Sequence, residues 1–305
     1  MSTQEQMIPV KRDYKSRMFK LIFDDKRKLL ELYNAVSGKK YTNPDKLTIN
    51  ILENAIYMSM QNDISFIIDS RLSLYEHQST YNPNMALRFL FYLSDLYSDF
   101  TKNQNLYGSK RVSIPTPRFV VFYNGRDKRP DYEVLKLSDL YTVEDEEYAL
   151  ELIVDVININ KGHNAKLMEA CKDLCDYAEY TYRVRKYAES MSIESAVDKS
   201  MKECIREGIL KDFLEKHRTE VRAMSIYEYN EEEHMRMERE DAFEDGRKAG
   251  LEDGRKLGLE NGQKIGQEKI LSLISKMSAD GMADQISRIA KEPAFYEEMM
   301  KKYNM

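Results

Sequence analysis

Two carboxylic acids and an amide lie at the ends of neighbouring apolar segments in the stretch DISFIIDSRLSLYEHQS, residues 63–79. They are Asp63, Glu76 and Gln78. Two carboxylates that lie close together repel each other, so one of them holds a proton or a cation sits between them. A few carboxylates with water suit Mg²⁺ or Mn²⁺, which acidifies bound water and stabilises charge on a phosphate. This set favours phosphodiester hydrolysis, although strand-end residues that simply face solvent have the same spacing.

A β-hairpin is the element that would bring these three side chains together. If residues 64–68 and 71–75 pair around a turn at Asp69 and Ser70, opposed residues have numbers that sum to 139, and the two carboxylates face each other. Directly opposed Cβ atoms lie about 4.5 to 5.5 Å apart. The amide follows on the same face, about 7 Å further along the strand. A slip of one residue would separate the set.

The rest of the first 190 residues alternates helix-like and strand-like segments. Apolar residues recur at helical spacings over residues 13–36, and NPNMALRFLFYLSDLYSDF, residues 82–100, is predicted to be a buried helix. RFVVFYNG, residues 118–125, is predicted to be a core strand because β-branched and aromatic residues lie between prolines and an Asn-Gly turn. A further strand is expected within residues 149–164, followed by a helix from Ala165. This order is typical of an α/β fold.

Composition restricts the classes of protein that the chain can belong to. Its 305 residues, 42% hydrophobic and 32% charged, allow a packed core beside a strongly solvated remainder. No apolar run reaches the length of a membrane span, and the start has no apolar signal core, so a cytoplasmic protein is expected. Cys171, Cys175 and Cys204 are expected to be reduced and structural. The net charge of −5 argues against nucleic-acid binding in general, although local basic patches can still bind phosphate.

The C-terminal third has a different character. We divide the chain into a domain of residues 1–190, a charged helical connector of 191–245, a repeat of 246–267 and a small helical tail of 268–305. In the repeat, glycine occupies every fourth position from Gly246 to Gly266. Each glycine costs a helix about 1 kcal/mol relative to alanine, whereas the Glu-to-Lys pairs at i, i+4 return only about 0.2 to 0.5 kcal/mol each. Two interpretations stay open: a flexible tether, or a helix whose glycine row lets another backbone approach in a homo-oligomer.

The motifs NDISFII, LYEHQS and NPNMALRFLFYLSDLY together resemble the PD-(D/E)XK nuclease-family transposases, also called the recombination-promoting nuclease family. The resemblance covers about residues 13–190 and implies a restriction-endonuclease-like core, in which helices flank a mixed sheet. It implies that Asp63 and Glu76 bind Mg²⁺ or Mn²⁺ and that Gln78 occupies the position of a lysine that orients water. Asn62 replaces the proline of the pattern, and an amide brings no positive charge. Glu31 and Glu53 are weak candidates for a further acidic residue of this pattern.

Other polar residues of the chain are better explained by structural roles. His77 is expected on the opposite face of the strand from its neighbours Glu76 and Gln78, and Asp69 is expected in the turn. The cations at Arg88, Lys110, Arg111 and Arg118 suit either phosphate contacts or solvated surface.

Our leading hypothesis is a metal-dependent DNA endonuclease, with Asp63 and Glu76 holding the ion and Gln78 positioning water. The partner implied is DNA, with no membrane. The alternative is a catalytically inactive nucleic-acid-binding or regulatory protein that assembles through its C-terminal repeat. A toxin-like element controlled by its own tail would share the nuclease chemistry and differ in regulation.

Overall fold

The computed structural model describes residues 17–49 and 63–305. The chain forms two compact units, the first ending at Glu233 and the second beginning at His234. Asp63, Glu76 and Gln78 all belong to the first unit. Glu53 lies outside the described residues, as do residues 13–16 of the predicted N-terminal helices.

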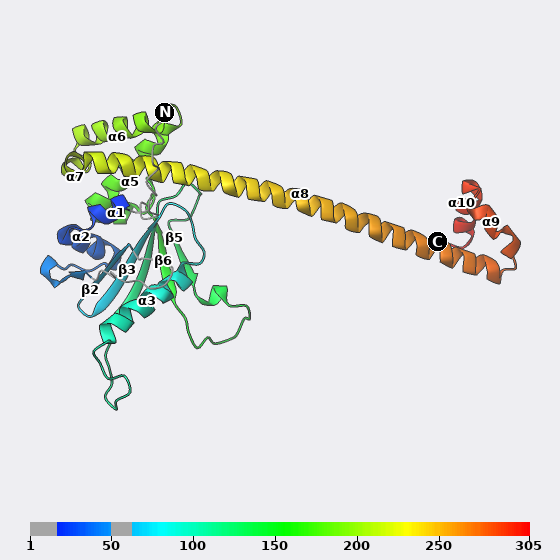
Figure 1. The fold of residues 1–305 in the computed structure, drawn as a ribbon, viewed down its shortest axis with the longest axis horizontal. Helices are drawn as coiled ribbons and strands as arrows, with labels where there is room; N and C mark the ends of the chain where they lie inside the picture. The colour runs from blue at the N-terminus through cyan, green and yellow to red at the C-terminus, as the bar shows by residue number, and fades with distance from the viewer. Residues whose placement is uncertain (1–16, 50–62) are drawn as a thin grey trace, which may run out of the picture. The chain divides into compact units, whose positions relative to one another are not determined.

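A mixed sheet forms the centre of the first unit (Figure 1). Its six strands in the described residues are β1 (Thr48–Ile49), β2 (Ile64–Ile68), β3 (Arg71–Gln78), β4 (Thr116–Tyr123), β5 (Tyr132–Lys136) and β6 (Ile153–Asn158). Their spatial order is β1-β2-β3-β4-β6-β5. The first three strands are antiparallel neighbours, β3, β4 and β6 are parallel, and β5 is antiparallel to β6. A parallel pair requires a crossover, and the helix α3 (Met85–Thr101) provides it between β3 and β4.

Helices cover both faces of this sheet (Figure 1). The buried side of α3 packs on one face, together with Leu72 and Leu74 of β3. On the other face, α1 (Arg17–Ile22), α2 (Lys26–Ser37) and α5 (Lys172–Ala188) share a core with Tyr75 of β3 and Phe122 of β4. Strand β3 is therefore buried on both sides, from Leu72 through Gln78. Polar residues at its end must find partners inside the protein, because they are removed from water.

The first unit extends beyond residue 190. The helices α4 (Ala165–Ala170), α6 (Ile193–Glu207) and α7 (Lys211–Lys216) follow β6, and α8 (Arg218–Ala279) begins within this unit. Val197 of α6, Leu214 of α7 and Val221 of α8 belong to the same core as α1 and α2. These helices therefore stabilise the domain that carries the candidate residues.

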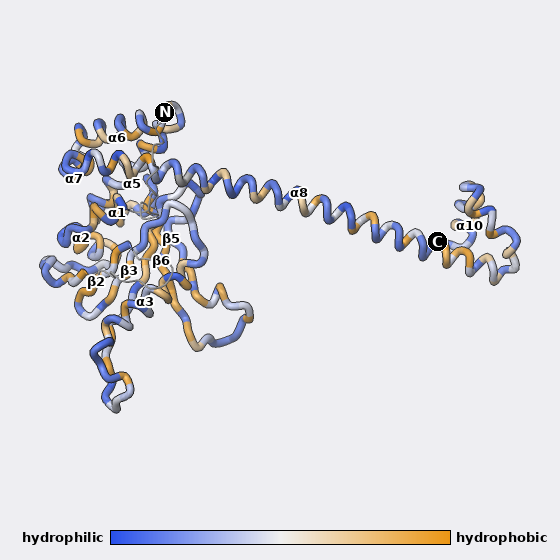
Figure 2. The backbone as a smooth tube through the Cα atoms, in the orientation of Figure 1, coloured by the Kyte–Doolittle hydropathy of each residue, from blue (hydrophilic) through white to orange (hydrophobic). Residues whose placement is uncertain are grey.

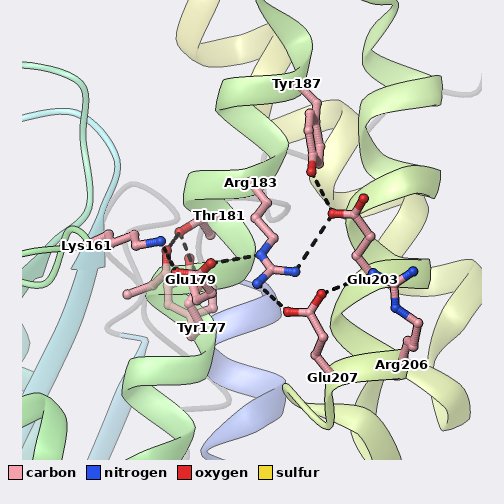
Figure 3. Close-up of polar contacts among 10 residues, drawn as sticks. Lys161, Tyr177, Glu179, Thr181, Arg183, Tyr187, Glu203, Arg206 and Glu207 are labelled. Atoms are coloured by element: carbon pink, nitrogen blue, oxygen red, sulfur yellow. Dashed lines mark hydrogen bonds and ion pairs between the residues drawn. The ribbon is translucent and has the colours of Figure 1, made fainter.

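An ion-pair network centred on Arg183 joins α5 to α6 (Figure 3). Its Nε donates to Glu179 at 2.8 Å and its Nη2 donates to Glu207 at 2.6 Å. Lys161, in the loop after β6, reaches the other oxygen of Glu179 at 2.7 Å. Because the Arg183 side chain is only 17% exposed, these bonds are screened less by solvent than ordinary surface pairs.

The second unit consists of the C-terminal part of α8 and the short helices α9 (Ile286–Ile289) and α10 (Pro293–Lys302). Leu273 and Met277 of α8 pack on Phe295 and Met299 of α10. The six glycines of the repeat lie in α8, and a Cβ atom added at any of them would meet nothing within 4 Å. Figure 2 shows α8 as mostly hydrophilic, with isolated hydrophobic positions. The repeat is thus helical, and its glycine row is not packed against any described residue.

Most of the predicted elements are present. The α/β class, the 64–75 hairpin, the buried helix at 85–101, the strands near 118 and 153 and the helix from Ala165 are confirmed. The three cysteines are free thiols, as expected. Strand β5 was not predicted.

Candidate functional site

The hairpin has the register that the sequence predicts. Ile64 pairs with Tyr75 and Ile68 pairs with Arg71, so the numbers of paired residues sum to 139. Continued by one residue, this register places Asp63 opposite Glu76. The turn residues Asp69 and Ser70 have positive φ angles of 50° and 59°, the conformation that two-residue hairpin loops favour because it matches the strand twist.

Reciprocal hydrogen bonds tie Asp63 to the end of β3. The backbone N–H of Asp63 donates to Oε2 of Glu76 at 3.2 Å, and the backbone N–H of His77 donates to Oδ2 of Asp63 at 2.7 Å. Each carboxylate therefore accepts a backbone hydrogen bond from the opposing strand or its extension. The two carboxyl groups lie beside each other at one end of the hairpin.

Glu76 is the most buried carboxylate of this pair, with 5% of its surface exposed. Its Oε1 forms an ion pair with Nη2 of Arg88 at 2.7 Å. Burial raises the pKa of Glu76 well above its usual range, and the charge of Asp63 raises it further, whereas Arg88 lowers it. Removal of the carboxylate from water thus outweighs the single ion pair, so a further positive charge at this position would be favourable.

Gln78 lies on the same face of β3 as Glu76 and is 8% exposed. Its Nε2 lies 2.7 Å from Sδ of Met85, the first residue of α3. The structure therefore brings the amide to the predicted face but turns its nitrogen toward α3.

Arg88 is a member of the site whose position beside Glu76 the sequence did not predict, although Arg88 was one of the four cations considered as phosphate contacts. It lies on α3, three residues after Met85, and its Nε and Nη2 donate to the hydroxyl oxygen of Tyr92 at 3.2 and 2.7 Å. The side chain is only 26% exposed. Spacings of three and four residues place Met85, Arg88 and Tyr92 on one side of a helix. This spacing is the signal in the sequence that groups the three residues. It points to the site only when α3 is known to pack over the end of β3.

The backbone at the ends of β3 and β4 is tightly packed next to this site. The N–H of Asn124 donates to the carbonyl oxygen of Gln78 at 2.8 Å. Arg185 of α5 donates to the side-chain oxygen of Asn124 at 2.6 Å and to its carbonyl oxygen at 2.5 Å. A Cβ atom at Gly125 would lie 2.4 Å from the carbonyl oxygen of Ser79. Glycine is therefore required here for the close approach of two backbone segments.

The remaining residues considered from the sequence lie elsewhere. His77 faces the opposite core, where its Nε2 lies 2.9 Å from the hydroxyl of Tyr177, as expected for a structural residue. Asp69 accepts a hydrogen bond from the hydroxyl of Tyr41 at 2.7 Å in the turn. Glu31, on α2, accepts from the backbone N–H of Lys172 at 3.1 Å, and α2 belongs to the layer on the other face of the sheet from Glu76.

The other three cations considered as phosphate contacts are not part of this cluster. Arg118 lies 3.8 Å from Asp155 and is half exposed, and Lys110 and Arg111 are exposed in the segment between α3 and β4.

The carboxylate pair offers few ligands to a divalent ion. Residues 17–49 and 63–305 contain no group of three or more acidic, histidine or cysteine side chains arranged to hold a metal. Mg²⁺, however, is usually bound by one or two carboxylates, with water and substrate phosphate completing its shell. Asp63 and Glu76 meet this smaller requirement, provided that Glu76 is shared between the ion and Arg88.

Comparisons with protein-family models, curated proteins and solved structures found no match to this chain. In the part of the chain that the structure describes, no helix has both the length and the apolar character needed to cross a membrane.

Proposed function

We propose that the chain is a metal-dependent DNA endonuclease of the PD-(D/E)XK type. The observation that carries this proposal is the juxtaposition of Asp63, immediately before β2, with Glu76, near the end of β3. The fold supports it, because the sequence resemblance implies a mixed sheet flanked by helices and the first unit has such a sheet. The three free cysteines suit the reducing cytoplasm, where we place the protein.

The residues of the site have separable tasks in this proposal. Asp63 and Glu76 would hold a Mg²⁺ or Mn²⁺ ion, which when bound supplies a more acidic water and counter-charge for a phosphate. The backbone N–H of His77 fixes the orientation of the Asp63 carboxylate. Gln78 would hydrogen-bond to the attacking water or to a phosphate oxygen after its amide turns away from Met85. The oxygen of water would attack phosphorus and lose a proton to the solvent, while the bond from phosphorus to the leaving oxygen would break and that oxygen would take a proton from water.

The test is plasmid nicking with purified protein in Mg²⁺ or Mn²⁺. Asp63→Asn removes the charge but keeps an oxygen that can accept from the His77 N–H, and we expect it to lower the rate about a hundredfold or more. Asp69→Asn is the matched control in the same hairpin, and asparagine tolerates its positive φ. Equal rates for Asp63→Asn and the wild type would refute the assignment.

The ion pair of Glu76 with Arg88 also favours a second candidate. It gives Glu76 a charged partner without any metal, as expected of a catalytically inactive nucleic-acid-binding or regulatory protein. That candidate predicts no Mn²⁺ binding at Asp63 and no cleavage. Calorimetric titration of the protein with Mn²⁺ in the absence of DNA distinguishes the two functions.

A further inference from the structure

The guanidinium of Arg88 is held next to Glu76 by several contacts. Its Nη2 lies 2.7 Å from Oε1 of Glu76 and 2.7 Å from the hydroxyl of Tyr92, and its Nη1 lies 3.4 Å from Sδ of Met85. The partners on α3 belong to the buried side of that helix. Arg88 is thus fixed in position, unlike an arginine that samples solvent.

The same site lacks a cation where the resemblance implies one. Gln78 is neutral, and its amide nitrogen faces Met85. Arg88 contacts that same sulfur atom, so the guanidinium and the Gln78 amide converge on one point near Glu76. An arginine keeps its charge at every relevant pH and offers several directed N–H donors for carboxylate or phosphate oxygens.

We propose that Arg88 is a positioning residue that supplies, from α3, the positive charge that Gln78 does not bring from β3. This inference rests on the proposed nuclease function. Arg88 orients the Glu76 carboxylate and places a fixed positive charge beside the carboxylate pair.

This role has an unusual physical signature. A guanidinium beside Glu76 repels a divalent cation, so removing its charge should tighten cation binding by about tenfold or more at the effective dielectric of a protein. The same change removes a charge that stabilises phosphate, and losses of about a hundredfold in rate are typical for such donors. A purely structural arginine would instead weaken cation binding when removed, because the carboxylates would lose their arrangement.

The experiment compares four variants with the wild type: Arg88→Gln, Arg88→Lys, the double variant Arg88→Gln with Gln78→Lys, and the control Arg118→Gln. Arg118 also pairs with an aspartate of the sheet but lies outside the cluster. We measure Mn²⁺ affinity without DNA, the single-turnover cleavage rate at saturating Mn²⁺ and the melting temperature.

We expect Arg88→Gln to bind Mn²⁺ about tenfold more tightly while cleaving about a hundredfold more slowly. Arg88→Lys should retain much of the rate. Adding Gln78→Lys to Arg88→Gln should raise the cleavage rate at least about tenfold, because the positive charge then comes from β3. Arg118→Gln should change none of these quantities.

An unchanged cleavage rate in Arg88→Gln would overturn the inference. Weaker Mn²⁺ binding in Arg88→Gln would also overturn it, as would a cleavage rate that Gln78→Lys does not raise. If the wild type binds Mn²⁺ but cleaves no DNA, the proposed function fails, and the inference about Arg88 is then decided by the Mn²⁺ affinities alone. If the wild type binds no Mn²⁺, the inference fails as well.

Discussion

Acidification should destabilise the first unit through His77. This side chain is only 3% exposed, its ring stacks on Phe19 with 5.2 Å between centroids, and its Nε2 lies 2.9 Å from the hydroxyl of Tyr177. Burial lowers the pKa of His77 to about 3, and the charge of Arg185 contributes to the same shift. The folded protein therefore keeps this imidazole neutral across the mildly acidic range.

The sign and size of the effect follow from linkage. In the unfolded chain the pKa of His77 has its ordinary value of 6.5. Between that pH and the folded pKa, the unfolded state binds a proton at His77 and the folded state does not. The stability contributed by His77 is present above pH 6.5 and is lost as the pH falls toward the folded pKa. Between about pH 7.5 and about pH 5 the loss is about 2 kcal/mol, at 1.36 kcal/mol for each pKa unit.

Urea denaturation of the wild type and His77→Gln at several pH values measures this loss. The amide of glutamine can still meet the Tyr177 hydroxyl but does not titrate in this range. Glu76 acts in the opposite direction, because its raised pKa favours folding at low pH, but it is common to both proteins and cancels in the difference. The control is His217→Gln, because His217 is a histidine that lies near the surface. Parallel pH profiles for the wild type and His77→Gln would refute the reasoning.

Three further predictions concern packing, the ion network and assembly. Gly125→Ala should destabilise the first unit by about 1 to 3 kcal/mol because its Cβ meets backbone. Gly254→Ala should instead stabilise α8 by about 0.5 to 1 kcal/mol. The two variants should therefore shift the melting temperature in opposite directions. Arg183→Met should cost about 2 kcal/mol in denaturant unfolding, because it leaves two carboxylates without their shared partner, and an unchanged midpoint would contradict this. Deleting the chain after Asp245 should lower the oligomeric mass in light scattering if the repeat mediates assembly, and an unchanged mass would exclude that role.

The register of the candidate site could be predicted because local and tertiary signals agree. The two-residue turn at Asp69 and Ser70 joins β2 to β3, and in a hairpin the length and type of the turn set the register. The Asp-Ser turn is not the most favoured pair, yet aspartate tolerates positive φ, and Asp69 gains a hydrogen bond from Tyr41.

The position of Arg88 beside Glu76 and the existence of β5 could not be predicted by the same reasoning, for different physical reasons. The importance of Arg88 depends on how α3 lies across the end of β3, which is a tertiary property that its local spacing does not contain. Strand β5 is short and lies at the sheet edge, with only Leu135 of its five residues buried, so its hydrophobic alternation is weak. The extent of the first unit was also not predicted, because α6 and α7 have few apolar residues and many charged ones.

The residues that carry the proposed chemistry also hold the hairpin together. Glu76 accepts the backbone N–H of Asp63, and Asp63 accepts that of His77, so each carboxylate has both a structural and a proposed chemical role. Truncating Glu76 would leave the half-buried Arg88 without its carboxylate, and breaking such pairs costs about 3 to 5 kcal/mol when they are fully buried. Loss of activity in Glu76→Ala would therefore not separate chemistry from folding. Asp63→Asn separates them, because the amide preserves the hydrogen bond while removing the charge that a metal ion requires.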